Sequence, residues 1–150
     1  AFSGSLLERG LKTFNLRAKT MANNAQAVAD FLESHKKVKR VYYPGLKSNV
    51  GYEVAKKQMS NGFGGMLSYE VGETQNDAKK FVENLKKIKH AVSLGCTESL
   101  VCLPVLTTML YMPLDGRLSF GVNENTIRMS CGIEDTDELI DDMKQALDRI

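Results

Sequence analysis

Several residue types that mark particular classes of protein are rare in this chain of 150 residues. It contains no tryptophan, three prolines, two histidines and three cysteines, Cys96, Cys102 and Cys131. The cysteines form no CxxC pair, and with two histidines they match no zinc-binding motif, so we expect no metal site. An odd number of cysteines without a recognisable pairing favours a reducing, cytoplasmic compartment. No apolar run approaches the roughly 20 residues of a membrane-spanning helix, so we expect no membrane segment.

The rest of the composition is typical of one globular domain. Hydrophobic residues make up 43% and charged residues 25% of the chain, which is long enough to bury a core. The N-terminal stretch AFSGSLLERG has neither an initiator methionine nor the charged-then-apolar order of a signal peptide. We therefore expect residues 1–150 to be a single domain cut from a longer chain.

The net charge of +2 conceals an uneven distribution. Residues 1–90 carry sixteen Lys/Arg and eight Asp/Glu, whereas residues 91–150 carry four and ten. The basic runs KKVKR and KKIK fall where helices end or strands begin, and cations there suit the helix dipole. Because no aromatic residues interleave these runs, we expect no nucleic-acid partner.

Apolar periodicity predicts alternating helices and strands. The first expected helix is a long one over about 5–33, with Gly10 and the FNL stretch as candidate break points near its start. The other expected helices are a short one over 52–59, one capped by Thr74 and one capped by Asp135 with Glu138 in a capping box; the expected strands are 38–43, 66–71, 90–94 and the TIRMSC stretch. Region 95–125 shows no regular pattern. Gly62, Gly64 and Gly65 precede a strand, not a helix, which favours a tight backbone approach over a phosphate cradle. We predict an α+β fold with about four mostly antiparallel strands and helices on one face.

The stretch TIRMSCGIED places a cation in the middle of a predicted strand. Alternation puts Arg128 on one face with hydroxyl residues and Cys131 on the apolar face, so Cys131 is interpreted as a core residue. A guanidinium fits the two oxygens of a carboxylate, which makes Arg128 a candidate anion-binding residue. The alternative is a local ion pair with Glu98, Glu124 or Glu134. From the pattern alone both interpretations stay open.

Two further features are weaker candidates for chemistry. Ser93 lies where a predicted strand gives way to a loop, but neither histidine stands in a recognisable triad context for a serine nucleophile. The acidic run EDTDELIDD does not have calcium-loop spacing, and we interpret it as a helix N-terminus and a solvated face.

Six motifs follow one another along nearly the whole chain. They are RGLKTFNLR (9–17), NAQAVADFLESH (24–35), VYYPGLKS (41–48), AKKQMSNGFGGMLSYEV (55–71), AVSLGCTESL (91–100) and IRMSCGIEDTDELIDDMKQAL (127–147). In this order they resemble the C-terminal domain of the fold-type I pyridoxal-phosphate enzymes of cysteine and methionine metabolism, the trans-sulfuration family that includes cystathionine γ-lyase, cystathionine γ-synthase and methionine γ-lyase.

This resemblance implies a role for four residues. Arg128, in the R-x-S-x-G-I-E-D motif, would hold the α-carboxylate of an amino-acid substrate, and Ser93 would lie beside that carboxylate and the cofactor. Thr108 would lie near the same pocket, although Met109 replaces the histidine that the family carries next to it. Val92 occupies a position where methionine γ-lyases have valine and cystathionine-handling members often have glutamate, whereas GFGGMLS resembles the γ-synthases.

The resemblance also implies what the chain lacks and what the parent protein does. The lysine that binds pyridoxal phosphate, the acid at its pyridine nitrogen and the phosphate-binding loop would belong to an upstream domain, and Lys12 is not that lysine. We predict a cytoplasmic homotetramer that cleaves a C–S bond by γ-elimination, with γ-replacement by a synthase or sulfhydrylase, or a non-catalytic α+β assembly domain, as alternatives. The isolated chain should be inactive.

Overall fold

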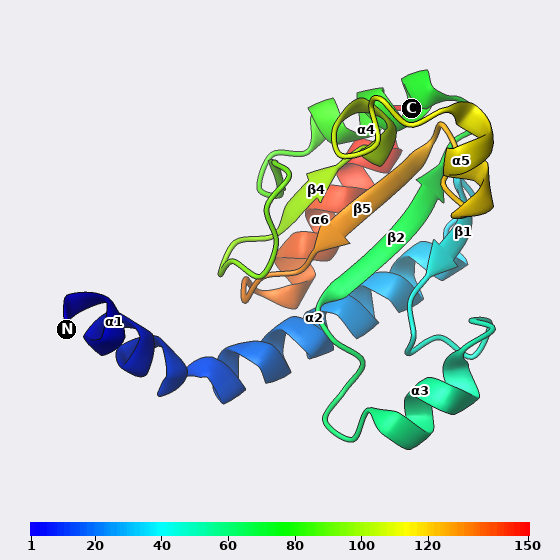
Figure 1. The fold of residues 1–150 in the computed structure, drawn as a ribbon. Helices are drawn as coiled ribbons and strands as arrows, with labels where there is room; N and C mark the ends of the chain where they lie inside the picture. The colour runs from blue at the N-terminus through cyan, green and yellow to red at the C-terminus, as the bar shows by residue number, and fades with distance from the viewer.

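The computed structural model describes residues 1–150 as helices packed on a single sheet (Figure 1). In chain order the elements are α1 (Phe2–Leu11), α2 (Phe14–Ser34), β1 (Val38–Tyr42), α3 (Tyr52–Gln58), β2 (Met66–Val71), α4 (Gln75–Asn84), β3 (Lys89–His90), β4 (Leu100–Cys102), the 3-10 turn η1 (Pro104–Leu106), α5 (Leu114–Ser119), β5 (Thr126–Ser130) and α6 (Thr136–Leu147). The predicted α+β class is confirmed.

The sheet has five strands in the order β1-β2-β5-β4-β3. β1 with β2, β2 with β5, and β5 with β4 are antiparallel, and only the short edge pair β3–β4 is parallel. β5, the last strand in sequence, therefore lies at the centre, between β2 and β4. A side chain on β5 is therefore flanked by neighbouring strands on both sides.

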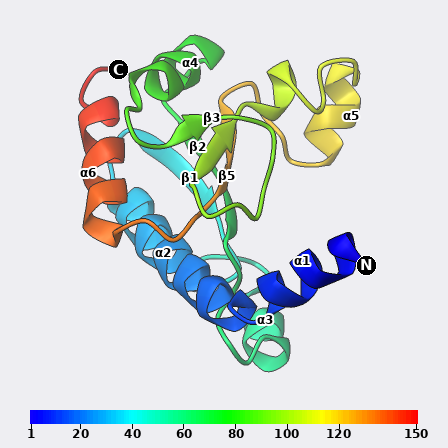
Figure 2. The ribbon, with the colours of Figure 1, turned by 90° about the vertical axis from the view of Figure 1, so that its left-hand side faces the viewer.

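Three helices cover one face of the sheet. α2 packs on β1 and β2, α4 packs on β2 and β5, and α6 packs against both helices. Figure 2 shows α2 and α6 on one side of the strands and α5 on the other. The core between helices and sheet includes Val28, Leu32, Phe81, Met129 and Met143, each no more than 5% exposed. The predicted one-sided helical layer is correct for α2, α4 and α6.

The long N-terminal helix is two helices. The predicted helix over about 5–33 is interrupted at Lys12 and Thr13, where α1 ends and α2 begins, between the two suggested break points, Gly10 and the FNL stretch. Thr13 has φ −109° and ψ 1°, and Arg17 of α2 donates through Nη2 to the carbonyl of Gly10 at 2.9 Å. α1 buries none of its residues, so its own packing contributes little to holding it in line with α2.

The edge of the sheet differs from the prediction. The expected strand 90–94 is reduced to the two residues of β3, and the missed strand β4 lies inside the region predicted to be irregular. β4 is short and buried throughout, so its sequence LVC has no alternation to reveal it. The chain leaves the sheet after Ala91 because Gly95 turns it with φ +72°, a conformation that suits glycine.

Helix boundaries follow their capping residues closely. Thr74 and Asp77 form a reciprocal capping box at the start of α4, which confirms the predicted cap. Asp135 accepts hydrogen bonds from the amides of Asp137 and Glu138 at the start of α6, but Glu138 pairs with Lys87 at 2.8 Å rather than closing the expected box. Asp135 alone therefore satisfies the first amides of α6.

Two carboxylates of the EDTDELIDD run are not solvated. Asp142 is 5% exposed and accepts hydrogen bonds from the consecutive amides of Lys86, Lys87 and Ile88 at 2.8 to 3.1 Å. Glu134 accepts from the amide and hydroxyl of Ser99. The prediction of a solvated face is wrong for these two residues because each replaces water with backbone amides of a neighbouring loop.

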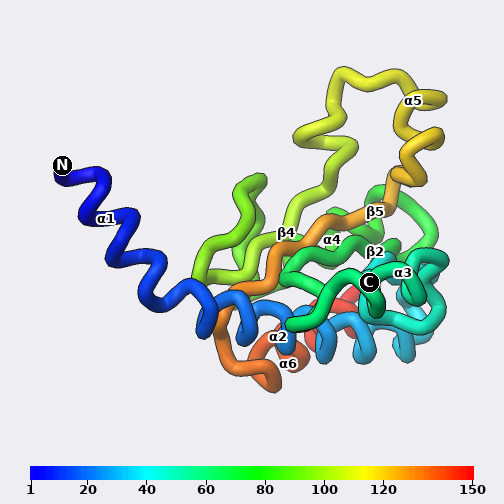
Figure 3. The backbone as a smooth tube through the Cα atoms, turned by 60° about the horizontal axis from the view of Figure 1, so that its bottom comes forward, coloured from blue at the N-terminus to red at the C-terminus, as the bar shows by residue number.

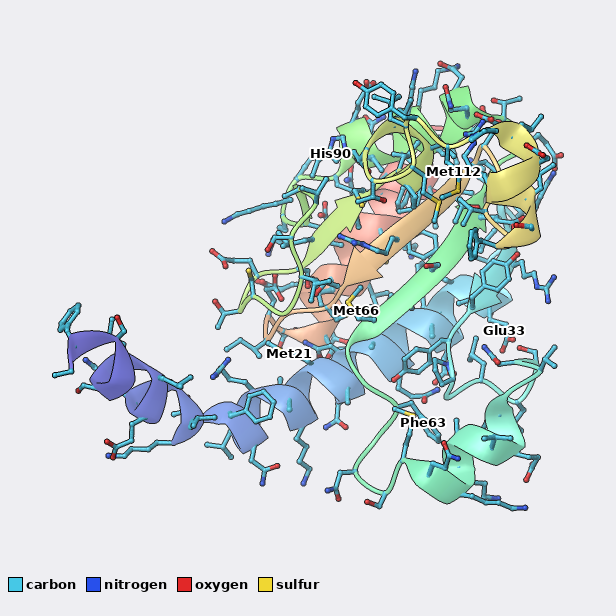
Figure 4. All side chains as sticks on the ribbon, in the orientation of Figure 1. Met21, Glu33, Phe63, Met66, His90 and Met112 are labelled. Atoms are coloured by element: carbon cyan, nitrogen blue, oxygen red, sulfur yellow. The ribbon has the colours of Figure 1, made fainter.

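Two peripheral segments are attached to this body. Phe63, labelled in Figure 4, lies between Tyr43 and Tyr52, with ring centroids 6.4 and 6.1 Å away, and so connects α3 to the core. Figure 3 shows the segment from β4 to β5, which contains α5, standing off from the body. Met112, at this end of the molecule in Figure 4, lies close to Gly116 of α5. No helix has both the length and the apolar character needed to cross a bilayer.

Replacing Asp142 should lower stability sharply. We expect Asp142→Ala to reduce the free energy of unfolding by about 2–4 kcal/mol, because three buried amides lose a charged acceptor. Urea unfolding followed by circular dichroism measures this change. Asp141→Ala, which removes the exposed neighbouring carboxylate, is the matched control and should change little; equal effects of the two substitutions would contradict the anchoring role.

The three thiols should differ in reactivity. Cys102 and Cys131 are buried, and burial raises the pKa of the Cys131 thiol to about 12, whereas Cys96 is partly exposed. Because the thiolate is the reacting form, a disulfide reagent should modify one thiol rapidly in the native chain and all three in denaturant. Cys96→Ser should remove the rapid phase. Rapid native modification of Cys131 would overturn its assignment to the core.

Candidate functional site

The site is built around Arg128 at the middle of β5. Its strand neighbours Ile127 and Met129 are fully buried on the helix side, so alternation sends Arg128 to the opposite face. Ser68 of β2 and Cys102 of β4 are its partners in register across the sheet. The predicted two-faced strand is confirmed, and its cation projects from the centre of the sheet.

The guanidinium of Arg128 contacts backbone carbonyls and no acid. Nη2 donates to the carbonyl oxygens of Val92 at 2.6 Å and Ser93 at 3.1 Å, while Nε is buried without a hydrogen-bond partner. A buried donor without an acceptor is uncommon in a folded protein.

The alternative of a local ion pair is wrong. Each acid that could have paired with Arg128 is engaged elsewhere: Glu98 with Lys89 at 3.1 Å, Glu124 with Arg117 at 2.9 Å, and Glu134 with Ser99. The sequence offered these acids as candidate partners, but the fold turns their side chains elsewhere. Arg128 therefore keeps a charge that no side chain of the chain neutralises.

A pocket of about 410 Å³ lies beside the guanidinium. Its ten lining residues come from the sheet and from the protruding segment between β4 and β5: Tyr42, Ser68, Pro104, Thr108, Met109, Phe120, Gly121, Val122, Thr126 and Arg128. Thr108, singled out from the sequence, and Met109 thus share the pocket with Arg128. The side chain of Thr108 is exposed and forms no hydrogen bond within the chain, so its hydroxyl is free for a ligand.

Val92 and Ser93 reach the site in an unexpected way. Their carbonyls contact Arg128, but their side chains are exposed and neither lines the pocket. The Ser93 hydroxyl has one contact, with Sγ of Cys96 at 3.8 Å. In this chain the structure therefore brings the backbone of the SLG segment to Arg128 and leaves the Ser93 hydroxyl at the surface.

Sequence reasoning missed Tyr42 and Ser68 as pocket residues. They reach the pocket through strand pairing, Tyr42 opposite Ser68 and Ser68 opposite Arg128. Tyr42 donates to Oε1 of Glu70 at 2.5 Å, and its own burial, followed by this carboxylate, raises its pKa. Tyr42 therefore contributes a protonated phenol to the wall of the pocket. Only the register, which the sequence did not specify, could have identified it.

The pocket suits the carboxylate end of an amino-acid ligand. By itself it has no group that could bind an aldehyde cofactor covalently. It contains a cation for a carboxylate and three aliphatic hydroxyls, those of Ser68, Thr108 and Thr126, but no lysine lines it. The Gly62–Gly65 loop is no phosphate cradle, because it runs into β2 and its Gly64 carbonyl accepts from the Tyr43 hydroxyl at 3.0 Å. No cluster of three His, Cys, Asp or Glu side chains is placed to hold a metal ion.

Comparisons with known proteins identify the family of the chain. The sequence matches the family described as Cys/Met metabolism PLP-dependent enzyme over residues 1–148. It is 46% identical over 144 residues to cystathionine beta-lyase of Lactococcus lactis subsp. cremoris (strain MG1363). That alignment covers 96% of this chain and 37% of the relative. It is 44% identical over 145 residues to cystathionine gamma-lyase of Bacillus subtilis (strain 168). That alignment covers 97% of this chain and 38% of the relative.

A solved structure extends the likeness to the fold. Cystathionine gamma-lyase from Lactobacillus plantarum, solved in complex with L-serine, superimposes with a TM-score of 0.88 at 40% identity, over 97% of this chain and 38% of that chain. The chain thus spans well under half the length of the relatives that it matches. The family match covers nearly every residue, and the chain belongs to the pyridoxal-phosphate-dependent enzymes of cysteine and methionine metabolism.

Proposed function

We propose that residues 1–150 form the substrate-carboxylate-binding domain of a pyridoxal-phosphate-dependent enzyme that cleaves a C–S bond of a sulfur amino acid. The observation that carries the proposal is Arg128: a central-strand cation without an acidic partner, with an unpartnered buried Nε, beside a pocket. A guanidinium in this state is suited to a carboxylate, which amino-acid substrates of every type share.

The role of Arg128 would be to position the substrate. Two charged hydrogen bonds to the α-carboxylate fix the rotation of the amino acid about Cα and direct its side chain along the pocket. Pyridoxal phosphate, when bound, supplies the electron sink that makes removal of the Cα proton possible. The exposed Ser93 hydroxyl would be available to donate to the cofactor or to the substrate carboxylate, and Thr108 would contact the substrate farther along the pocket.

The chemistry that we propose is γ-elimination. The pocket beside Arg128 is lined by Met109, Phe120 and Val122, whose apolar side chains suit a thioether chain. The resemblance adds Val92, which stands where methionine γ-lyases have valine. The likeness to a cystathionine gamma-lyase supports this choice. The likeness to a cystathionine beta-lyase makes β-elimination the second candidate. Product analysis with cystathionine separates the two, because γ-cleavage leaves a four-carbon keto acid and β-cleavage a three-carbon one.

The domain would work together with a separate pyridoxal-phosphate-binding region. Two observations support this part of the proposal: no lysine lines the pocket, and α1 buries none of its residues while Phe2, Leu7 and Leu11 are each at least 60% exposed. Exposed apolar side chains gathered on one helix usually meet another protein surface. The relatives have more than half of their length outside the matched region, which is enough to supply such a surface.

Removing the guanidinium should impair catalysis without releasing the cofactor. In the complete enzyme that we propose, Arg128→Ala should lower kcat/KM roughly 30- to 900-fold, or about 2–4 kcal/mol, because two charged hydrogen bonds to the substrate are lost. Absorbance of the bound cofactor should be retained. Arg149→Ala, at the exposed C-terminus, is the control. An unchanged kcat/KM in Arg128→Ala would show that this arginine is structural.

The chain by itself should form no specific cofactor adduct. When it is mixed with pyridoxal phosphate and treated with borohydride, we expect mass spectrometry to find no stoichiometric modification of a single lysine, because no lysine lines the pocket. We also expect no keto acid from cystathionine. A single, fully modified lysine with turnover would contradict the proposed division of the site between two regions.

A further inference from the structure

The loop over residues 92–99 is tied to the strand that carries Arg128 at several points. It leaves β3, passes over the end of β5 and returns as β4. Arg128 holds the carbonyls of Val92 and Ser93, and the amide of Ile133 donates to the carbonyl of Thr97 at 2.9 Å. Two further contacts involve side chains that have no role in the proposed function, Ser130 and Glu134.

Ser130 fastens the middle of the loop. Its hydroxyl accepts a hydrogen bond from the amide of Gly95 at 2.9 Å, and the residue is 2% exposed. Ser130 lies two positions after Arg128 on the same face of β5, so the same strand face supplies both contacts to the loop. Between these contacts the chain turns at Gly95 in a left-handed conformation, φ +72°.

Glu134 fastens the end of the loop. Its carboxylate accepts from both the amide and the hydroxyl of Ser99, and the same hydroxyl accepts from the amide of Gly132 at 2.9 Å. No cation pairs with Glu134, so the acid is bound entirely to this loop. A side chain at position 132 would come within 2.6 Å of the Glu98 carbonyl carbon, so only glycine permits this approach.

The outer side of this arrangement is fixed to the helical layer. Asn24 of α2 is 2% exposed, and its Nδ2 donates to the carbonyls of Gly132 at 3.1 Å and Glu134 at 2.8 Å. Its Oδ1 accepts from the hydroxyl of Thr136 at 2.6 Å. The segment that holds the loop is thus itself held by a buried amide, and little freedom remains between the core and the Val92 and Ser93 carbonyls.

We propose that Ser130 is a positioning residue for Arg128. By holding Gly95 it keeps the carbonyls of Val92 and Ser93 in place against Nη2, so that the guanidinium is already oriented before any carboxylate arrives. Glu134 supports the same loop from its other end. Pre-orientation matters because a free arginine side chain loses rotamer entropy on binding, and that cost weakens the complex. The inference rests on the proposed role of Arg128 as the carboxylate-binding residue.

Substitution of Ser130 in this chain of 150 residues tests the inference by nuclear magnetic resonance. In Ser130→Ala we expect hydrogen exchange at the Gly95 amide to become about tenfold faster, which corresponds to about 1.4 kcal/mol. We also expect the Arg128 Nε–H signal to broaden or shift, a change that general destabilisation does not produce. L-methionine, used as the carboxylate probe, should bind several-fold more weakly, whereas L-methioninamide, which lacks the carboxylate, should not shift the signal in any variant.

Two variants and a control separate positioning from stability. Ser130→Thr keeps a hydroxyl and should restore slow exchange at Gly95. Ser130→Cys keeps the volume but offers a poor acceptor, so it should behave like Ser130→Ala and serves if the alanine variant does not fold. Asn125→Ala removes a buried side chain that holds Val71 and Gly72 near the other end of β5; it should lower stability but leave the Arg128 signal unchanged.

The outcomes distinguish this inference from the function on which it rests. Unchanged Gly95 exchange and an unchanged Arg128 Nε–H signal in both Ser130→Ala and Ser130→Cys would overturn the positioning role. A native chain whose Arg128 signal does not respond to L-methionine would instead count against the carboxylate site. The Gly95 and Arg128 signals measured without ligand would still decide whether Ser130 holds the loop.

Discussion

The alternation of side chains along β5 is the constraint on which the rest of the structure depends. Ile127 and Met129 enter the core beneath the helices, and this burial forces Arg128 onto the opposite face. A shift of one residue in register would move the cation into the core and expose two large apolar side chains. Because β5 pairs with β2 and β4 on both sides, the hydrogen bonds of two neighbours oppose such a shift. Placement of the cation and stability of the core therefore have the same cause.

Most of the helical layer could be predicted from the sequence because its signals are local. A cap such as Thr74 and apolar residues at helical spacing are sufficient to locate α4, and the same reasoning located α2 and α6. β4 could not be predicted in this way, since three consecutive buried residues carry no period. The break at Thr13 lies between Gly10 and the FNL stretch, where the sequence suggested one, but no single strong breaker fixed its position in advance.

The site was predictable in its central residue and not in its surroundings. Arg128 stood out because a charge interrupts an otherwise regular strand. Glu98, Glu124 and Glu134 were candidates for an ion pair with Arg128, yet each of them is bound elsewhere, and only the folded chain shows it. The family resemblance identified Ser93 and Thr108 as site residues. Arg128, however, contacts Ser93 through its backbone carbonyl and not through its hydroxyl. Tyr42 depends on strand register, for which the sequence had no signal.

The arrangement around Arg128 also explains why so short a motif can carry so much of the site. In R-x-S-x-G-x-E, alternation places Arg128 and Ser130 on one face, and Gly132 and Glu134 continue toward the 92–99 loop as the strand ends. One residue presents the charge and the next three at this spacing secure the loop whose carbonyls hold it. A cation without an acidic partner remains free for an anion only if something neutral fixes its position. Backbone carbonyls meet that requirement, since they orient the guanidinium and leave its charge uncancelled.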